Sequence, residues 1–303
     1  MRIAAFDFGS NALKCLIANV TPKRLSFLQD VRMQTRLGSS VSSSGNLSTQ
    51  AMNDTISDVR FIQRAFLSDL EVDECIAVGT QALRTASNSK AFIRKLKRDT
   101  DISLKIISAE EEAQLSWEGA ISGLKNPQQQ VTLFDSGGAS TEIVQGQGKQ
   151  IEQSISLPVG AVNLAMCYIF NDPPTDYELK VLTSVLADLK IHLNPKGNLI
   201  GLGGGIVACA KLLFGKDPDD YYVLDGRSIK LADINALLNQ LAPLSIEQRN
   251  ELPGMETDRS DIIVPALILY KTLMEKLGYQ KLSVCIRGLR HGLIQRYWEN
   301  TLV

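Results

Sequence analysis

The sequence predicts an α/β protein made of two related halves, each built on a mixed sheet, and two observations carry this prediction. Apolar strand-like runs alternate with helix-like segments along the chain, as in proteins whose sheets are covered by helices. The run "IAAFDFGSNALKCLIAN" (3–19) also has the same form as "VTLFDSGGASTEIVQG" (131–146): apolar strand, Asp-x-Gly turn, small hydroxyl residues, apolar strand. Asp7 and Asp135 lie 128 positions apart (135 − 7), about the length of one domain. We therefore expect duplicated halves that face each other across a cleft.

The first half is expected to form a domain over residues 1–125, ending at the break "KNPQQQ" (125–130). Its segments read in the order strand 2–8, strand 13–20, strand 25–37, loop 38–48, a helix from Ser48, strand 74–80, helix 88–99, strand 104–108 and helix 108–124. Asn88 and Ser108 are the expected N-caps of the two later helices.

The second domain is expected over residues 126–303. Its segments read as strands 131–136, 141–146 and 153–160, a helix from about Ala161, a helix over 176–192, a strand into "GLGGG" (201–205), further helices, strand 281–288 and a terminal helix from about 289. The terminal helix could pack back on the first domain.

Composition limits the classes of function. The chain has 303 residues, 44% apolar and 21% charged, and its net charge of −1 provides no overall field toward nucleic acid or a membrane surface. The apolar run "IIVPALILY" (262–270) is too short to cross a bilayer, and Asp7 interrupts the apolar start, which excludes a signal peptide. Scattered cysteines without a C-x-x-C pair indicate buried thiols. With only His192 and His291 available, carboxylates must supply any catalysis, and we expect a cytoplasmic protein.

The first candidate site is the turn "DFGSNALK" (7–14). Gly9 allows the backbone to approach an anion, Ser10 and Asn11 offer hydrogen-bond donors, and Lys14 lies on the outgoing strand within reach of the turn. An ordinary hairpin with Asn at a turn position has the same sequence, so both interpretations stay open.

The second candidate site is the corresponding turn of the second half, where Asp135 precedes the glycines and Glu142 follows them. Two such carboxylates can hold a hard cation such as Mg²⁺, with phosphate oxygens completing its shell. The alternative is a pair of solvated carboxylates at strand ends. Two such turns, separated by about the length of one domain, are stronger evidence for a binding site than either turn alone.

A third candidate is the glycine cluster in "IGLGGGIVACAKL" (200–212), between an apolar strand and a helix. Backbone amides at such a helix N-terminus bind phosphate. Gly203, Gly205 and Ala208 also satisfy the G-x-G-x-x-A form of a dinucleotide fingerprint, but the acids that follow lie in the "KDPDD" loop instead of ending a second strand. The cluster predicts a phosphate loop whose ligand is left open.

Two charged residues of the first half complete the candidate set. Glu112 falls at the edge of the apolar face of its helix, where a half-buried carboxylate would have a raised pKa suited to a general base. Glu111, three residues after Ser108, completes a capping box, and a solvated acid is the alternative for Glu112 as well. Arg84 follows a buried strand just before a helix, a good position for gripping phosphate, although an isolated arginine more often forms a surface ion pair.

Together these segments resemble the exopolyphosphatase and guanosine pentaphosphate phosphohydrolase (Ppx/GppA) family, and the resemblance covers nearly the whole chain. It rests on motifs in the correct order: "DFGSNALK", "VGTQALRTASN", "ISAEEEA", "FDSGGASTE", "SISLPVGAVNL", "GLGGG", "LPGMETDRSDIIVPA" and "RGLRHGL". The resemblance implies two duplicated actin-like (ribonuclease H-like) domains with mixed sheets flanking a central cleft. It also implies removal of a terminal phosphate from an anionic chain, with Mg²⁺ or Mn²⁺ as cofactor.

The family's site residues are carried over by position. The resemblance makes Glu112 the general base and Arg84 a phosphate-binding arginine. The remaining phosphate-binding candidates are Gly9, Ser10, Asn11, Lys14, Gly137, Gly138, Ser140, Thr141, Gly203, Gly204 and Gly205, and the metal-binding candidates are Asp7, Asp135 and Glu142. The chain departs from the family pattern at Ala12, Lys14, Ala139, Asn163, Gly205 and His291. None of these departures removes Glu112, Asp135 or Glu142.

The expected function is exopolyphosphatase: water attacks the terminal phosphate of inorganic polyphosphate. The alternatives are hydrolysis of pppGpp to ppGpp on the same residues, a catalytically weak sensor of a phosphorylated ligand, and an ATP-dependent kinase of the same fold. The partner is therefore polyphosphate or pppGpp, with no nucleic acid and no membrane, and a homodimer is a possible assembly. A short basic track with Lys14, Arg84, Arg287, Arg290 and Arg296 would hold the chain, while Tyr221 and Tyr222 are the aromatic residues that could stack on guanine. Longer family members carry a further helical region, to which nothing in this sequence corresponds.

Overall fold

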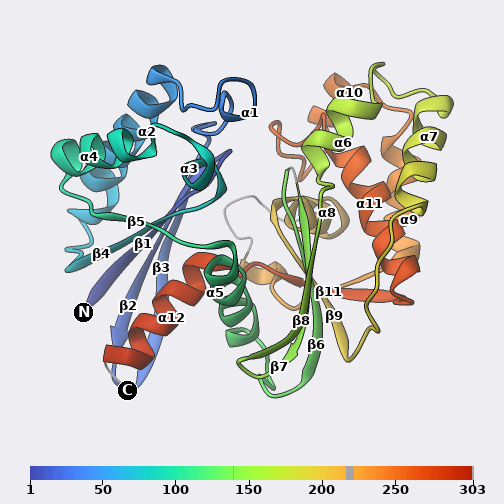
Figure 1. Ribbon diagram of the computed structural model, residues 1–303. Coiled ribbons are helices and arrows are strands. Elements are labelled where there is room, and N and C mark those ends of the chain that lie inside the picture. Colours follow the sequence, from blue (N-terminus) through green and yellow to red (C-terminus); the bar gives the residue numbers. More distant parts are fainter. Residues whose placement is uncertain (139, 216–221, 302–303) are drawn as a thin grey trace. The chain divides into compact units, whose positions relative to one another are not determined.

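The computed structural model describes residues 1–138, 140–215 and 222–301, and the chain forms two compact units (Figure 1). The first unit comprises Met1–Ser122 together with the C-terminal stretch from Gly288, and the second comprises Gly123–Arg287. The chain thus leaves the first unit once and returns to it at its end. The terminal helix α12 (Leu289–Thr301) therefore belongs to the first unit.

The first unit is built on a five-stranded sheet in the order β3-β2-β1-β4-β5. Its strands are β1 (Arg2–Phe8), β2 (Leu13–Thr21), β3 (Arg24–Met33), β4 (Glu74–Gly79) and β5 (Leu104–Ile106). Strands β1, β2 and β3 are antiparallel neighbours, whereas β4 pairs parallel with β1 and β5 pairs parallel with β4. The sheet is mixed because tight turns join the first three strands and helical connections lead to the other two.

Helices cover both faces of this sheet. They are α1 (Val41–Ser44), α2 (Thr49–Ile62) with its π-helical extension η1 (Gln63–Leu67), α3 (Gln81–Thr85), α4 (Ser89–Thr100), α5 (Ala109–Ser122) and α12. Along β1, Ala4 and Phe6 face the core formed with α2 and α4, whereas Ile3 and Ala5 face α5 and α12. Because side chains of a strand alternate between faces, a strand buried on both sides is continuously apolar, as β1 is up to Asp7.

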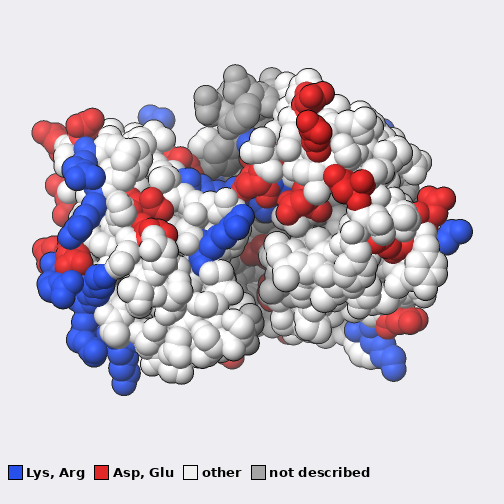
Figure 2. Space-filling model, turned by 90° about the horizontal axis from the view of Figure 1, so that it is seen from above, with Lys and Arg blue, Asp and Glu red and all other residues white. Residues whose placement is uncertain are grey.

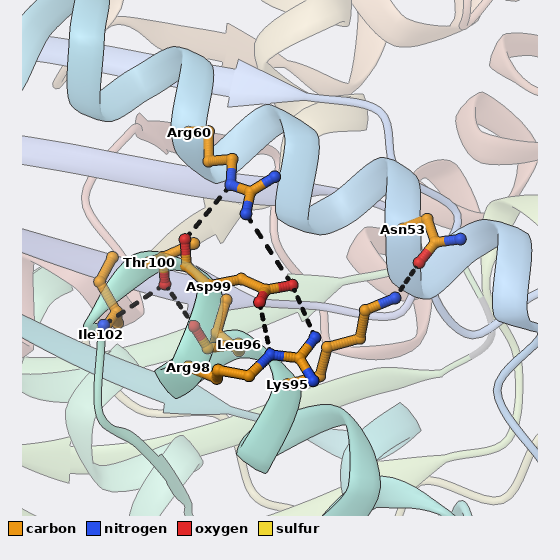
Figure 3. A network of polar contacts seen from close by, with 8 residues as sticks. All are labelled: Asn53, Arg60, Lys95, Leu96, Arg98, Asp99, Thr100 and Ile102. Carbon is orange, nitrogen blue, oxygen red and sulfur yellow. Dashed lines mark hydrogen bonds and ion pairs between the residues drawn. The ribbon is translucent and has the colours of Figure 1, made fainter.

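A polar network around Asp99 joins α4 to α2 (Figure 3). The Asp99 carboxylate accepts a hydrogen bond from Arg98 Nε at 2.7 Å, which is the main cause of the lowered pKa of Asp99. Arg60 of α2 donates through Nε to the Asp99 carbonyl at 3.2 Å, and its Nη2 lies 3.9 Å from the Asp99 carboxylate. These contacts hold the two helices together on one side of the sheet.

Helix α4 also makes one edge of the first unit basic. Figure 2 shows Lys and Arg side chains gathered along the edge that carries this helix. Its exposed cations are Lys90, Arg94, Lys97 and Arg98, and the last two pair with Asp101 and Asp99. Part of this charge therefore stabilises the helix itself, and no candidate site residue lies on this edge.

The second unit repeats the architecture of the first. Its sheet has the order β10-β11-β9-β6-β7-β8, with β6 (Gln130–Ser136), β7 (Thr141–Gln147), β8 (Gln150–Leu157), β9 (Asn198–Leu202), β10 (Ser228–Lys230) and β11 (Lys281–Cys285). Strands β6, β7 and β8 are antiparallel, and β9 and β11 continue parallel from β6. The run β8-β7-β6-β9-β11 therefore corresponds to β3-β2-β1-β4-β5, and the predicted α/β duplication is confirmed.

The helices of the second unit enclose one large apolar core. They are α6 (Ala161–Tyr168), α7 (Asp176–Ala187), α8 (Gly204–Phe214), α9 (Leu231–Leu241), α10 (Ile246–Asn250) and α11 (Ile263–Lys276). Every residue from Ile263 to Tyr270 is buried, so the apolar run at 262–270 forms a helix inside the core. Among the described residues, none of the helices combines the length and the apolar composition that a bilayer-spanning segment needs.

Several segments differ from the sequence-based expectation. A short helix, α3, follows β4, and Arg84 lies on it instead of between a strand and a helix. Asn88 occupies the N-cap position of α4, but its side chain makes two hydrogen bonds with the backbone of Leu47 instead of capping the helix. Helix α7 ends at Ala187 and not at 192, because Leu189, Ile191 and Leu193 contact the core with the spacing of two residues that an extended segment has.

The cysteines follow the expectation of buried thiols only in part. Cys15, Cys209 and Cys285 are buried, and burial raises the pKa of both Cys209 and Cys285 to about 12. Cys75 is half-buried and Cys167 is exposed. The three buried thiols thus behave as small apolar side chains of the two cores.

Candidate active site

The turn between β1 and β2 holds the first set of candidate residues. Asp7 and Lys14 are cross-strand partners, and the Gly9 N–H donates to the Ala12 carbonyl at 3.1 Å to close the turn. A Cβ on Gly9 would lie 3.0 Å from that carbonyl, so the tightness of the turn favours glycine. Ser10 and its neighbour Asn11 are exposed at the tip. The structure therefore brings these candidates together at one end of the hairpin.

Asp7 is the buried carboxylate of this turn. The residue is 7% exposed, and within the described parts of the chain its Oδ1 atom is buried without a hydrogen-bond partner. Its Oδ2 atom lies 3.8 Å from Lys14 Nζ. Leaving a buried polar atom unpaired costs about 1–3 kcal/mol, and more for a charged group. A structural hairpin does not need such an oxygen, whereas a turn that binds a cation does.

Arg84 and Glu112 form an ion pair within the first unit. Arg84 Nη1 donates to Glu112 Oε2 at 2.7 Å and to the Ile107 carbonyl at 3.1 Å. The two side chains are 27% and 33% exposed, and pairs of this exposure contribute about 0–1 kcal/mol to stability. The pair therefore acts mainly by orienting the side chains of Arg84 and Glu112. The sequence predicts a half-buried carboxylate at the edge of an apolar face, and the structure adds Arg84 as a cationic partner of Glu112.

The neighbouring glutamates have partners of their own. Ser108 Oγ accepts a hydrogen bond from the Glu111 N–H at 3.1 Å, as expected for an N-cap. The capping box predicted that the Glu111 carboxylate would contact Ser108. The carboxylate instead pairs with Lys105 Nζ at 2.9 Å. The pKa of Glu110 is lowered by hydrogen bonds from its own N–H and from the Ser108 hydroxyl. The three consecutive glutamates are thus distinct in their surroundings.

Helix α5, which carries Glu112, lies very close to α12. A Cβ on Gly119 would overlap the carbonyl group of Gly288, and a Cβ on Gly292 would overlap the carbonyl group of Leu115. Only glycine at these two positions lets the helix backbones approach so closely. The C-terminal helix therefore helps to fix the position of α5 and of Glu112.

The turn between β6 and β7 holds the candidate metal ligands. Asp135 and Glu142 are directly opposite each other in the register of the hairpin, which places both side chains on one face of the sheet. Glu142 Oε1 accepts a hydrogen bond from Ser156 Oγ at 2.9 Å, and the Gly137 N–H donates to the Ser140 carbonyl at 2.9 Å. Both carboxylates are half-buried.

The same turn is attached to helix α6. The carbonyls of Gly137 and Gly138 accept hydrogen bonds at 2.9–3.1 Å from the first three N–H groups of the helix. Thr141 is fully buried, and its hydroxyl donates to the Val159 carbonyl at 2.7 Å. Among the described residues of the turn, Gly137 and Gly138 are the exposed ones, and Thr141 shapes the turn from inside.

Gly203 brings the glycine cluster against this turn. Its φ of +110° disfavours other residues, and a Cβ there would overlap the Ser136 carbonyl. The same Cβ would lie 3.4 Å from Asp135 Oδ1. The start of α8 and the carboxylate of β6 are therefore neighbours, so two separate candidates of the second unit form one site.

The first turn of α8 contacts two side chains to which the sequence analysis gave no role. A Cβ on Gly204 would overlap the guanidinium of Arg259, and a Cβ on Gly205 would overlap the hydroxyl of Tyr270. Tyr270 is fully buried, and burial raises its pKa. Arg259 lies in "ETDRSDII" (256–263). An arginine among acidic residues just before an apolar helix is the sequence feature that could have indicated its role.

The carboxylates can be tested against the expected cation. Mg²⁺ in proteins commonly takes one or two carboxylates and completes its shell with water and substrate phosphate. The facing pair Asp135 and Glu142 fits this pattern, and in the other unit the unpaired buried oxygen of Asp7 suits a cation as well. The residues that the structure describes include no cluster of three or more His, Cys, Asp or Glu placed to hold a metal. The donor set thus fits a cation shared with a phosphate ligand.

Three arginines expected in a basic track are instead engaged with carboxylates. The pairs are Arg287 with Asp225, Arg290 with Asp30, and Arg296 with Glu118. Arg84 is paired in the same way, so the basic track formed by these residues stays a prediction.

The two expected guanine-stacking residues are also accounted for. Tyr222 is half-buried and packs against the apolar core of the second unit. Tyr221 and the "KDPDD" loop lie outside the described residues.

Two departures from the family pattern act as helix caps. His291 is 1% exposed, and its Nδ1 accepts a hydrogen bond from the Gly288 N–H at 3.3 Å at the start of α12. Asn163 Oδ1 accepts from the Gly160 N–H at 2.8 Å at the start of α6. Ala139 lies outside the described residues.

Comparisons with known proteins concern the family and the fold. A model of the Ppx/GppA phosphatase family matches residues 16–300. The structure is similar to that of the Aquifex aeolicus member of the Ppx/GppA protein family, with 28% identity, a TM-score of 0.84 and 99% of each chain covered. It is also similar to the type II variant of the Aquifex aeolicus Ppx/GppA phosphatase, with 28% identity, a TM-score of 0.81, and 97% of this chain and 98% of that chain covered.

A third similar structure is an exopolyphosphatase from Cytophaga hutchinsonii, with 22% identity and a TM-score of 0.87, covering 99% of this chain and 98% of that one. At this level of identity the likeness concerns the fold alone. The predicted fold of two actin-like domains is confirmed.

Proposed function

Because this chain belongs to the Ppx/GppA phosphatase family and is thereby a phosphoanhydride hydrolase, we propose that it removes the terminal phosphate of short inorganic polyphosphate. The observation that carries the proposal is the ion pair in the first unit. Glu112, the candidate base, lies 2.7 Å from Arg84, a cation able to bind a phosphate oxygen. A base held beside a phosphate-binding cation is what in-line attack by water needs.

In the proposed reaction, Glu112 orients the attacking water and accepts its proton. A bond forms between the water oxygen and the terminal phosphorus while the bond from that phosphorus to the bridging oxygen breaks. Orthophosphate and a chain shorter by one phosphate leave. In the first unit, Arg84 and Lys14 offset negative charge on phosphate oxygens, and Arg84 also holds Glu112 in position.

The second unit supplies the metal ligands and further phosphate-binding groups. Asp135 and Glu142 would hold Mg²⁺ or Mn²⁺. Asp7 is a separate candidate metal ligand within the first unit. The cation, when bound, would supply positive charge for phosphate oxygens. The exposed glycines Gly137 and Gly138 are candidate phosphate contacts, and the N–H groups at the start of α8 are suited to phosphate. Arg259 would add a guanidinium beside the latter.

Two observations favour short polyphosphate over pppGpp. Tyr222 is half-buried against the apolar core, which leaves less of its ring for stacking on guanine. Ion pairs engage Arg287, Arg290 and Arg296, as one engages Arg84, so following a long chain would require each of them to exchange a carboxylate for phosphate. A few phosphate contacts thus remain to determine affinity.

Phosphate release, measured separately on polyphosphate, pppGpp and ATP, tests the proposal. Release from polyphosphate in excess of the other two supports it. Release mainly from pppGpp would establish the sister reaction instead. Consumption of ATP with transfer to an acceptor would indicate a kinase, and binding of polyphosphate without release from any of the three would indicate a sensor; either result would overturn the proposal.

A further inference from the structure

Helix α8 contains a lysine that its apolar surroundings do not explain. Lys211 is 4% exposed, on a helix whose other buried residues are apolar or glycine. Burying an ammonium group is costly unless the charge is paired, and an apolar residue of similar volume would fill the space at lower cost. A lysine at this position therefore suggests a role beyond packing.

The partner of Lys211 is a carboxylate that also faces an arginine. Lys211 Nζ donates to Glu256 Oε1 at 2.5 Å, and Glu256 Oε2 lies 3.6 Å from Arg259 Nε. The Lys211 side chain is 5% exposed, and those of Glu256 and Arg259 are 23% and 16% exposed. One carboxylate is thus shared by two cations, of which Arg259 is the one that reaches the first turn of α8.

The loop that carries Glu256 and Arg259 is held at several points. Gly254 has a φ of +86°, and a Cβ there would lie 2.8 Å from the Lys211 carbonyl, so the loop backbone packs directly on α8. Arg249, which is 2% exposed, donates through Nη1 to the Ser260 carbonyl at 2.9 Å. The loop is therefore a fixed support for the Arg259 side chain.

We propose that Lys211 and Glu256 are positioning residues for Arg259: they hold its guanidinium over the start of α8, where it contacts a phosphate oxygen of the ligand. The identity of the ligand rests on the proposed function. Without Glu256, the arginine would keep its charge but lose the contact that sets its direction. Without Lys211, Glu256 would be drawn entirely toward Arg259, and the guanidinium would turn away from the glycine turn.

The test measures binding of a non-hydrolysable imido analogue of tripolyphosphate by calorimetry, so that it does not depend on hydrolysis. Arg259→Ala should weaken Kd about tenfold or more, the effect of losing a charge-assisted hydrogen bond. Glu256→Gln, which is nearly isosteric, should weaken Kd about three- to tenfold, and Lys211→Met should do the same. With polyphosphate as substrate, the same variants should raise KM by similar factors and leave kcat within about twofold.

The decisive comparison is the double variant. If Glu256 acts through Arg259, then Glu256→Gln in the Arg259→Ala background should change Kd less than about twofold. The matched control is Glu275→Gln, which breaks the Lys271–Glu275 pair of α11 (3.3 Å) and should leave Kd unchanged. Equal effects of Glu256→Gln in both backgrounds would overturn the proposal, as would unchanged binding in Arg259→Ala. Because the analogue is not cleaved, these outcomes are independent of whether the enzyme hydrolyses polyphosphate.

Discussion

Glu112 is one of three consecutive glutamates that start α5, and the structure separates them by their partners. Glu112 pairs with Arg84, a candidate phosphate ligand, whereas Glu111 pairs with Lys105. Ser108 and the backbone lower the pKa of Glu110. A carboxylate held by a cation has a defined direction, which is a property that a base for water needs.

Replacing Glu112 with Gln should therefore lower turnover of polyphosphate by about 10²–10⁴-fold, the usual contribution of a general base. The amide retains the size of the side chain and an oxygen for Arg84, but it cannot accept a proton from water. Ligand binding and the melting temperature should change little. Initial rates of phosphate release at saturating polyphosphate give the measurement.

The control for this prediction is the same substitution one position earlier. Glu111→Gln breaks an ion pair of comparable geometry with Lys105 (2.9 Å), and exposed pairs contribute about 0–1 kcal/mol. Its turnover should remain within about twofold of the wild type. Equal turnover in the two variants would show that Glu112 is not the base.

Sequence alone indicated both members of the Arg84–Glu112 pair but not the pair itself. Each residue lies in a recognisable local motif, yet 28 positions separate them, and only the return of β5 beside β4 brings them together. Arg259 was missed for a related reason. Its contact with Gly204 depends on how a loop 55 positions later (259 − 204) folds onto α8, which local patterns do not encode.

Helices α5 and α12 pack against each other and join the two stretches of chain that form the first unit. Gly292 has no space for a Cβ, because it would overlap the Leu115 carbonyl. Gly292→Ala should destabilise the first unit by about 1–3 kcal/mol through overpacking, although alanine has the better helix propensity by about 1 kcal/mol. The chain's two tryptophans, Trp117 and Trp298, lie in these helices, so urea unfolding followed by tryptophan fluorescence reports on this unit.

Asn300→Ala provides a control in the same helix. Asn300 is exposed, and substitutions at such positions usually stay within about 0.5 kcal/mol of the wild type. If Gly292→Ala proved as stable as this control, the close approach of the two helices would not exist in solution.

The segment before α7 is organised by a single carboxylate. Glu178 accepts five hydrogen bonds from Phe170, Asn171 and Thr175, which lower its pKa from 4.5 to about 2, with the Thr175 N–H as the largest cause. A folded-state pKa below the unfolded value stabilises the fold fully above pH 4.5 or so, and this stabilisation is lost as the pH falls toward about 2.

Glu178→Gln should therefore destabilise the second unit at neutral pH and remove this part of its acid sensitivity. The difference in urea midpoint between wild type and variant, followed by far-UV circular dichroism, should be largest near neutral pH and shrink as the pH falls from about 5 to about 3. A difference that stays constant over this range would mean that the carboxylate is not stabilised by these donors.

At the scale of the whole molecule, the duplication was the feature most readily predicted. The strand–turn–strand pattern at Asp7 and Asp135 identified corresponding hairpins, because alternation and glycine turns are local properties of the sequence. The end of α7 and the packing of α12 on α5 were harder to predict. Both depend on which part of the protein the segment packs against. The spacing of apolar residues in a segment does not determine this.

Activity should require a divalent cation, since the few cationic side chains among the candidate site residues cannot by themselves neutralise a polyphosphate end. EDTA should abolish phosphate release, and Mg²⁺ or Mn²⁺ should restore it. Asp135→Asn and Glu142→Gln should raise the concentration of Mg²⁺ needed for half-maximal activity more than they alter the melting temperature. Full activity in metal-free buffer would refute the metal role.

We propose that this enzyme hydrolyses short polyphosphate by means of a few local phosphate contacts. The most direct test compares kcat/KM for tripolyphosphate, long-chain polyphosphate and pppGpp over a range of salt concentrations. We predict similar values for the two polyphosphates, a decrease with rising salt because the contacts are electrostatic, and a lower value for pppGpp. A strong preference for pppGpp, or a steep gain with chain length, would contradict the account.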